Sequence, residues 1–170
     1  MAEPLHRGIA ALLCRAPADW LLAAEALVAL ARARQRLARR RFADVAADWG
    51  RFEPATTGSR AAPQIESAAS QARAIGWAVR GAARFAPFKA LCLQQAVAAQ
   101  AMLARRGIGS VLHYGVGRDA DGALVAHAWI DAAGVALTGY PVPPGIVGVG
   151  AFVRDNGTTA QAHEEPIADQ

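Results

Sequence analysis

Cys92 and two histidines, His113 and His127, are the residues whose types and spacing can perform nucleophilic chemistry in this chain. Cys92 lies in "LCLQQAVAAQ", at the predicted start of an alanine-rich helix, where backbone N–H groups without helical partners and the helix dipole favour a thiolate. A thiolate needs a general base, and both histidines lie in predicted strands that follow this helix. His6 and His163 lie near the ends of the chain. The alternative is a buried structural cysteine, because free cysteine is among the most buried residue types.

Other kinds of site fit the sequence less well. A zinc site made of Cys92, His113 and His127 needs a fourth ligand, and pairs of closely spaced ligands are absent from the sequence. The sequence also lacks GxxxxGK[ST] and a GxGxxG that opens a helix, which are the patterns of phosphate-binding loops. We therefore expect neither a metal nor a cofactor.

Composition favours a folded protein that remains in the cytoplasm. The 170 residues are 54% hydrophobic and 19% charged, which suits one domain, or a small domain with a helical appendage. The two cysteines have no CxxC spacing, and the N-terminus does not resemble a secretory signal. The most apolar window, residues 20–31, contains Glu25 and is too short to span a bilayer, so we expect no membrane association.

An arginine run stands out in the first half of the chain. Residues 32–41, "RARQRLARRR", contain six arginines, and the formal net charge of the chain is +4. Such a run can bind nucleic acid, an anionic membrane or an acidic partner. Because aromatic residues are not interleaved with it and a nucleic-acid motif is absent, we interpret it as a solvated helix end and expect no nucleic-acid partner.

Helices are predicted in the first two thirds of the chain. Apolar spacing, Pro17, and Gly107 as a C-terminal cap give these helices their limits. The predicted helices are 17–41, 42–52, 65–85 and 90–106.

Strands are predicted after Gly107. The turn sequences "RDADG" and "AAG" separate three strands that form an antiparallel meander. These strands are 109–117, 123–131 and 135–140, and residues 146–153 form a last strand or an irregular closing segment. The predicted fold class is α+β, with one helix packed on an antiparallel sheet after a helical N-terminal region.

The chain divides into four predicted regions. A stretch rich in Pro, Gly, Thr and Ser without periodicity is the linker, and an acidic end is the disordered tail. The regions are a helical N-terminal region over 1–52, a linker over 53–64, a catalytic core over 65–155 and a tail over 156–170.

The stretch "PFKALCLQQAVAAQAMLARRGIGSVLHYGV", followed by "AHAWID", resembles the transglutaminase-like cysteine peptidases of lasso peptide biosynthesis. The resemblance extends over most of residues 15–140 and includes the Cys-Leu at a helix start, the Arg-Arg-Gly-Ile signal and the His-Ala-Trp strand. It implies that Cys92 is the nucleophile and His127 the general base and acid. Trp129, two residues after His127 on the same face of the strand, can form a wall of the site and orient the ring.

The resemblance also implies a reaction and its partners. Such a peptidase removes the leader from a ribosomally made precursor peptide, with the help of a leader-binding recognition protein, and a separate lasso cyclase then closes the macrolactam. A transglutaminase-type acyl transferase and a non-catalytic peptide-binding module of the same fold are the alternatives. Gln94 and Gln95 follow Cys92 and are interpreted as ordinary residues of the helix surface.

The third catalytic member is the point where this sequence departs from the resemblance. Asp131 lies four residues beyond His127 on the same strand, about 13 Å away, which is too far to orient the ring. If "AAG" forms a three-residue turn, Asp131 pairs with Val135 and His127 faces Gly139, where the family commonly carries an aspartate. The predicted acceptor for His127 is then the hydroxyl of Thr138, a backbone carbonyl near Gly139, or an acid from elsewhere.

Overall fold

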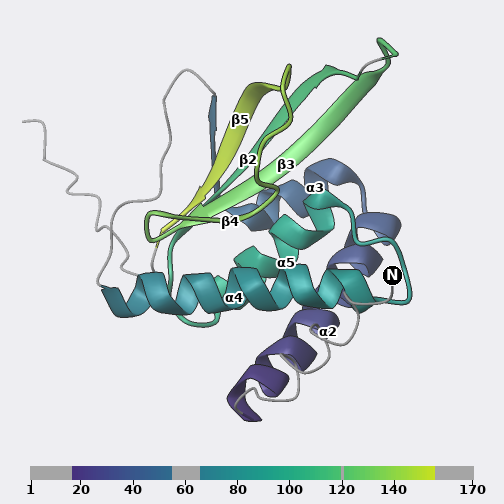
Figure 1. Ribbon diagram of the computed structural model, residues 1–170. Helices are drawn as coiled ribbons and strands as arrows, with labels where there is room; N and C mark the ends of the chain where they lie inside the picture. Colours follow the sequence, from purple (N-terminus) through teal and green to yellow (C-terminus); the bar gives the residue numbers. More distant parts are fainter. Residues whose placement is uncertain (1–16, 55–65, 120, 156–170) are drawn as a thin grey trace, which may run out of the picture.

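A computed structural model describes residues 17–54, 66–119 and 121–155 as a layer of helices against a five-stranded antiparallel sheet (Figure 1). The predicted α+β class is confirmed. Cys14, His6, His163 and the predicted tail lie outside the described residues.

Three long helices form most of the helical layer. They are α2 (Pro17–Arg39), α4 (Glu66–Phe85) and α5 (Cys92–Ala104). Their buried positions are mostly alanine, and such small side chains let helix backbones approach closely. Gly107, at φ +64°, follows α5 as the sequence predicted, and the Ile108 N–H returns to the Leu103 carbonyl. In the described part of the chain, no helix is both long and apolar enough to cross a bilayer.

The segment predicted as a helix over 42–52 is wrong in its second half. The helix α3 (Phe42–Ala46) is followed by a 3₁₀ turn, η1 (Ala47–Trp49), and then by strand β1 (Arg51–Pro54). Gly50 has φ +117°, a conformation that ends the helical path, and a Cβ atom there would lie 2.3 Å from the Val153 carbonyl oxygen.

The predicted linker therefore begins too early. Its first two residues, Glu53 and Pro54, belong to β1, which pairs with β5. The remainder of the linker lies outside the described residues.

The sheet has the order β1-β5-β2-β3-β4. Its remaining strands are β2 (Ser110–Arg118), β3 (Leu124–Ala132), β4 (Val135–Thr138) and β5 (Val147–Arg154). The predicted meander of β2, β3 and β4 is confirmed, each strand pairing antiparallel with the next. The last segment is a regular strand, but it lies between β1 and β2 and not at the edge beside β4.

One buried cluster joins the helices to one face of the sheet. It includes Leu30 of α2, Ile75 of α4, Met102 of α5 and Ile130 of β3. The Gln100 side-chain amide on α5 is buried and donates to the Trp49 carbonyl oxygen at 2.9 Å, which connects α5 to the segment that leads into β1. Side chains from both sides of the predicted linker share this cluster, and the division into regions stays a prediction.

Glu25 on α2 holds the end of α5. Its carboxylate accepts hydrogen bonds from Arg105 at 2.6 Å and from Arg106 at 2.7 Å. The hydrogen bond from Arg106, followed by that from Arg105, lowers the pKa of Glu25 from 4.5 to about 2, although partial burial opposes the shift. The ionised carboxylate therefore stabilises the folded state fully above about pH 4.5, and this stabilisation is lost as the pH falls towards 2.

We expect Glu25→Gln to lower the free energy of unfolding by about 1–2 kcal/mol at pH 7, a value reduced for solvent screening of the half-exposed arginines. The difference from the wild type should shrink at pH 2.5, which urea unfolding at the two pH values measures. Glu66→Gln is the control, because Glu66 pairs with Arg73 at 3.1 Å on an exposed surface, and its loss should change stability by less than about 0.5 kcal/mol. An equal effect of Glu25→Gln at both pH values would contradict this assignment.

Candidate active site

The start of α5 fixes the position of Cys92. Leu91, just before the helix, has extended backbone geometry with φ −70° and ψ 164°, and Cys92 is the first helical residue. The Gln94 side-chain oxygen accepts from the Leu91 N–H at 3.0 Å, and the Gln95 side-chain amide donates to the Ala90 carbonyl at 2.8 Å. Both glutamines are partly exposed on the helix, and their side chains also hold the two residues that precede the thiol.

Backbone N–H groups without helical partners lie at the start of α5. The first helical hydrogen bond runs from the Gln95 N–H to the Leu91 carbonyl at 3.0 Å, so the N–H groups of Cys92, Leu93 and Gln94 lie ahead of it. Leu91 has no polar side-chain atom and cannot cap these three N–H groups, and Gln94 reaches back only to the Leu91 N–H. These N–H groups can therefore bind an oxyanion that forms next to the thiol.

The Cys92 thiol is free and half-buried. Its side chain lies at the margin of the main buried cluster and contacts it, as do those of Ala90 and Leu93. Complete burial, expected of a purely structural cysteine, is not observed. The exposed Leu91 side chain lies beside the thiol in the sequence and adds an apolar surface there.

His127 lies on β3 and is held by a backbone carbonyl. Its Nε2 atom lies 2.6 Å from the Gly139 carbonyl oxygen, and because a carbonyl only accepts, Nε2 carries the proton in this contact. The Nδ1 atom of a neutral His127 is then the acceptor that can take a proton. The Trp129 ring stacks beside the imidazole, with centroids 6.0 Å apart and planes 20° apart, and its role as a wall of the site stays a prediction.

The predicted register between β3 and β4 is wrong. The turn has two central residues, Ala133 at φ 50° and Gly134 at φ 76°, and Ala132 pairs with Val135. Positive φ at both positions is the geometry of a tight hairpin turn, which alanine seldom adopts, so the sequence favoured the longer turn. Asp131 consequently pairs with Ala136 and not with Val135.

A bulge then alters the register again before Gly139. Ile130 pairs with Thr138, so Gly139 approaches Trp129 and not His127 across the hairpin. The carbonyl of Gly139 still reaches the His127 ring, as one of the predicted acceptors. Thr138 is fully buried, and its hydroxyl has no hydrogen-bond partner among the described residues, so this hydroxyl does not hold His127.

A second polar group joins β2 and β3 on the same face as His127. Asp131 Oδ2 lies 3.0 Å from His113 Nε2, and Asp131 Oδ1 accepts from the Tyr140 hydroxyl at 2.6 Å. The His113 ring also stacks on Trp129 at 5.4 Å, so this one indole lies between the two histidines. Sequence reasoning missed this group, although strand alternation and the antiparallel pairing of β2 with β3 bring these residues together.

The directions of α5 and β3 place Cys92 and His127 towards the same end of the helix–sheet pair. A short turn joins α5 to β2, so the two elements run in opposite directions and Cys92 lies towards the level of Gly115, which pairs with His127. In β3 the even positions, such as Ala128 and Ile130, face the helices. His127 occupies an odd position, so its side chain lies on the other face of the strand, away from α5.

The structure records no hydrogen bond between Cys92 and His127 among the described residues, and their catalytic pairing stays a prediction. Nor do three His, Cys, Asp or Glu side chains gather as a metal site within the described ranges.

A family model described as Transglutaminase-like superfamily matches residues 18–145. The match begins in α2, includes Cys92 and His127, and ends after β4, so it covers most of the chain. Comparisons with curated proteins and with solved structures gave no significant match.

Gly139→Ala should destabilise the protein by at least about 1 kcal/mol more than Gly134→Ala. Both glycines have positive φ, but a Cβ atom at Gly139 would lie 2.3 Å from the Ala128 carbonyl oxygen, whereas a Cβ atom at Gly134 meets open space. Gly134→Ala therefore controls for the cost of the left-handed backbone. Urea unfolding of the two variants measures the difference, and equal losses would contradict the close approach of β4 to β3.

Proposed function

Because the chain belongs to the transglutaminase-like superfamily, which includes cysteine peptidases and acyltransferases, we propose that it is a cysteine peptidase. Its proposed reaction is the removal of the leader from a ribosomally synthesised lasso precursor peptide, before a separate cyclase closes the macrolactam. The observation that carries the proposal is the position of Cys92 as the first residue of α5, with backbone N–H donors around it.

In the proposed mechanism the Cys92 thiol gives its proton to Nδ1 of His127, and the resulting thiolate attacks the scissile carbonyl carbon. A carbon–sulfur bond forms, and the negative charge on the carbonyl oxygen is stabilised by the N–H groups at the start of α5. His127 then donates a proton to the leaving amine as the carbon–nitrogen bond breaks. Water, deprotonated by His127, finally hydrolyses the thioester of the leader and restores the free thiol.

The hydrogen bond from His127 Nε2 to Gly139 leaves Nδ1 for proton transfer in this proposal. A backbone carbonyl thereby replaces the orienting aspartate, which a cysteine enzyme tolerates because a thiol ionises more readily than a hydroxyl. The mechanism requires substrate binding to bring together the Cys92 thiol and the His127 ring, which lies on the face of β3 away from α5.

His113 is an alternative general base for the same chemistry. His113 has the carboxylate partner that His127 lacks, because Asp131 contacts its Nε2 atom at 3.0 Å. This arrangement resembles the acid-oriented base of other nucleophilic enzymes. We still assign the base to His127, because it lies in the His-Ala-Trp motif and at the level of Gly115, close to the start of α5.

The proposed reaction implies the partners of the chain and the compartment in which it acts. The precursor peptide is the substrate, a leader-binding recognition protein delivers it, and the lasso cyclase takes the product, all in the cytoplasm. Acyl transfer to an amine is the alternative outcome of the same thioester, and a non-catalytic peptide-binding module would form no thioester at all.

Cys92→Ala should abolish cleavage of a precursor peptide encoded beside the gene, assayed by mass spectrometry with the leader-binding protein present. The nucleophile is lost, while the alanine keeps the start of α5 helical. Cys14→Ala is the matched control and should retain near wild-type rates. Cleavage by Cys92→Ala at a near wild-type rate would refute the peptidase mechanism, and a product joined to an added amine would favour the acyltransferase.

His127→Ala should lower kcat/KM by about 10²–10⁴-fold, the usual contribution of a general acid and base. His113→Ala and Asp131→Ala should each lower it by less than about tenfold, because these residues pair with each other and not with His127. Circular dichroism checks that all three variants fold. If Asp131→Ala and His113→Ala were as inactive as His127→Ala, the base would have to be reassigned to His113.

A further inference from the structure

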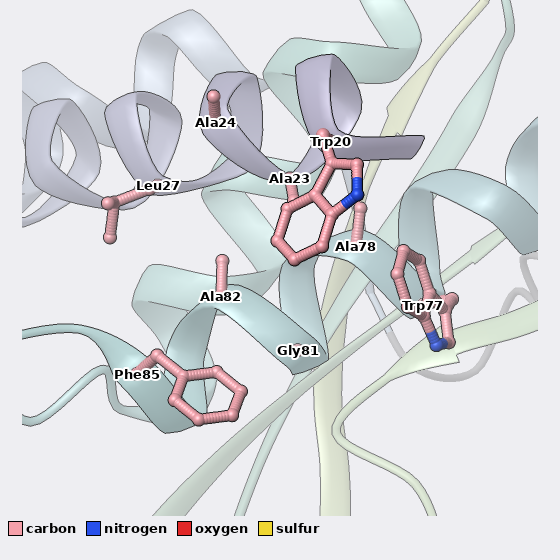
Figure 2. Close-up of a pocket in the computed structure, with 9 residues that line it drawn as sticks. All are labelled: Trp20, Ala23, Ala24, Leu27, Trp77, Ala78, Gly81, Ala82 and Phe85. Carbon is pink, nitrogen blue, oxygen red and sulfur yellow. The ribbon is translucent and has the colours of Figure 1, made fainter. Parts of the chain in front are cut away.

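An apolar groove lies between α2 and α4, apart from the cysteine and histidines. The groove has a volume of about 390 Å³, and Figure 2 shows its lining side chains facing one another across the two helices. They share an apolar character, with alanine and glycine at the base and large side chains at the rim: Trp20, Ala23, Ala24, Leu27, Trp77, Ala78, Gly81, Ala82 and Phe85.

The groove leads towards the start of α5. Trp20 and Trp77 lie at one end, and Leu27 and Phe85 lie at the other. Two helical turns beyond Leu27, the Arg34 guanidinium lies over the Phe88 ring, 5.2 Å from its centroid. Phe88 precedes Cys92 by four residues, so their Cα atoms lie within about 14 Å of each other, and Phe85, at this end of the groove, lies within about 25 Å of Cys92.

The rim side chains are exposed to a degree that needs an explanation. Trp20 is 49% exposed and Phe85 is 74% exposed, although both border the same apolar hollow. Exposed apolar side chains that border a concave apolar hollow are typical of a site that binds a ligand or a partner. The shape is concave and suits side chains inserted from a peptide, whereas a lipid bilayer is penetrated by protruding residues.

Basic residues near one end of the groove favour an acidic ligand there. Beyond the end formed by Leu27 and Phe85, the charged residues up to Arg36 and up to Cys92 are all arginine or lysine, whereas the acidic residues Asp19 and Glu25 lie on the N-terminal side of Leu27 in α2. An acidic ligand gains from this field, whereas a second copy of the chain, docked through the same surface, would bring two basic segments together.

We propose that this groove is a docking site for a segment of the peptide substrate, with apolar side chains in the hollow and an acidic residue at Arg34. The inference rests on the proposed peptidase function and adds a specificity element to it. A segment bound here raises the local concentration of the adjoining scissile bond near Cys92.

The test uses display pools of helical peptides that have random apolar residues on one face and either glutamate or lysine at the end of that face. Selection is performed on the full chain carrying Cys92→Ala, so that bound peptides stay intact. We expect the glutamate pool to be enriched. Failure of both pools, or preference for the lysine pool, would overturn the proposal.

Gly81→Leu fills the hollow and should weaken a selected peptide at least tenfold by fluorescence anisotropy, since a Cβ atom at Gly81 meets open space and the fold should tolerate it. Arg34→Glu should weaken binding at least threefold. Arg32→Glu, which makes the same charge change about 160° around α2, should change it less than twofold. Equal binding by all three variants, or binding to phosphatidylglycerol vesicles that Gly81→Leu leaves unchanged, would overturn the proposed site.

Joined to a cleavable precursor sequence, the selected segment should lower KM with little change in kcat, and Gly81→Leu should reverse this gain. Cleavage without any such dependence on the groove would refute the docking site alone. Binding without cleavage by the wild type would refute the peptidase proposal, and with it the assignment of the occupant as substrate.

Discussion

The fixed start of α5 is the constraint on which the rest of this structure depends. Gln94 and Gln95 hold the two residues before Cys92, the side chain of Gln100 attaches the middle of the helix to the segment before β1, and Glu25 of α2 holds its C-terminal arginines. The bonds of Gln100 and Glu25 run to other elements and limit sliding of α5, and the bonds of Gln94 and Gln95 fix the residues before Cys92 relative to α5 itself. The N–H groups at the start of α5 therefore keep one position relative to the sheet.

The sheet contributes histidines in two different environments. One is held by a backbone carbonyl, and the other by a carboxylate that a tyrosine hydroxyl also binds, with the Trp129 ring between them. In both rings Nε2 contacts an oxygen that only accepts, so each neutral ring presents Nδ1 for proton transfer. The glycine in place of an aspartate therefore leaves this site with an oriented histidine, although the orienting group is uncharged.

Periodicity and turn residues predicted most of the helices and strands. The pairing between strands far apart in the sequence could not be predicted from such local patterns. The helix that begins at Cys92, its end at Gly107 and the β2–β4 meander follow from periodicity and turn residues. The strand β1 was missed because Gly50 redirects a short helical segment to a distant partner, β5, and no local pattern reports that pairing. The hairpin register was missed because Ala133 adopts a positive φ, and the contact between His127 and the Gly139 carbonyl depends on a bulge that sequence alone does not reveal.

The most direct test of the central claim is to trap the covalent intermediate. Precursor peptide is mixed with the wild-type chain and the leader-binding protein, the reaction is quenched in acid within one turnover, and the intact protein is analysed by mass spectrometry. The proposed chemistry predicts a protein heavier by the acyl mass of the leader, sensitive to hydroxylamine, with the adduct on the peptide that contains Cys92. Cleaved precursor without an adduct at any time point, or an adduct on a residue other than Cys92, would contradict it.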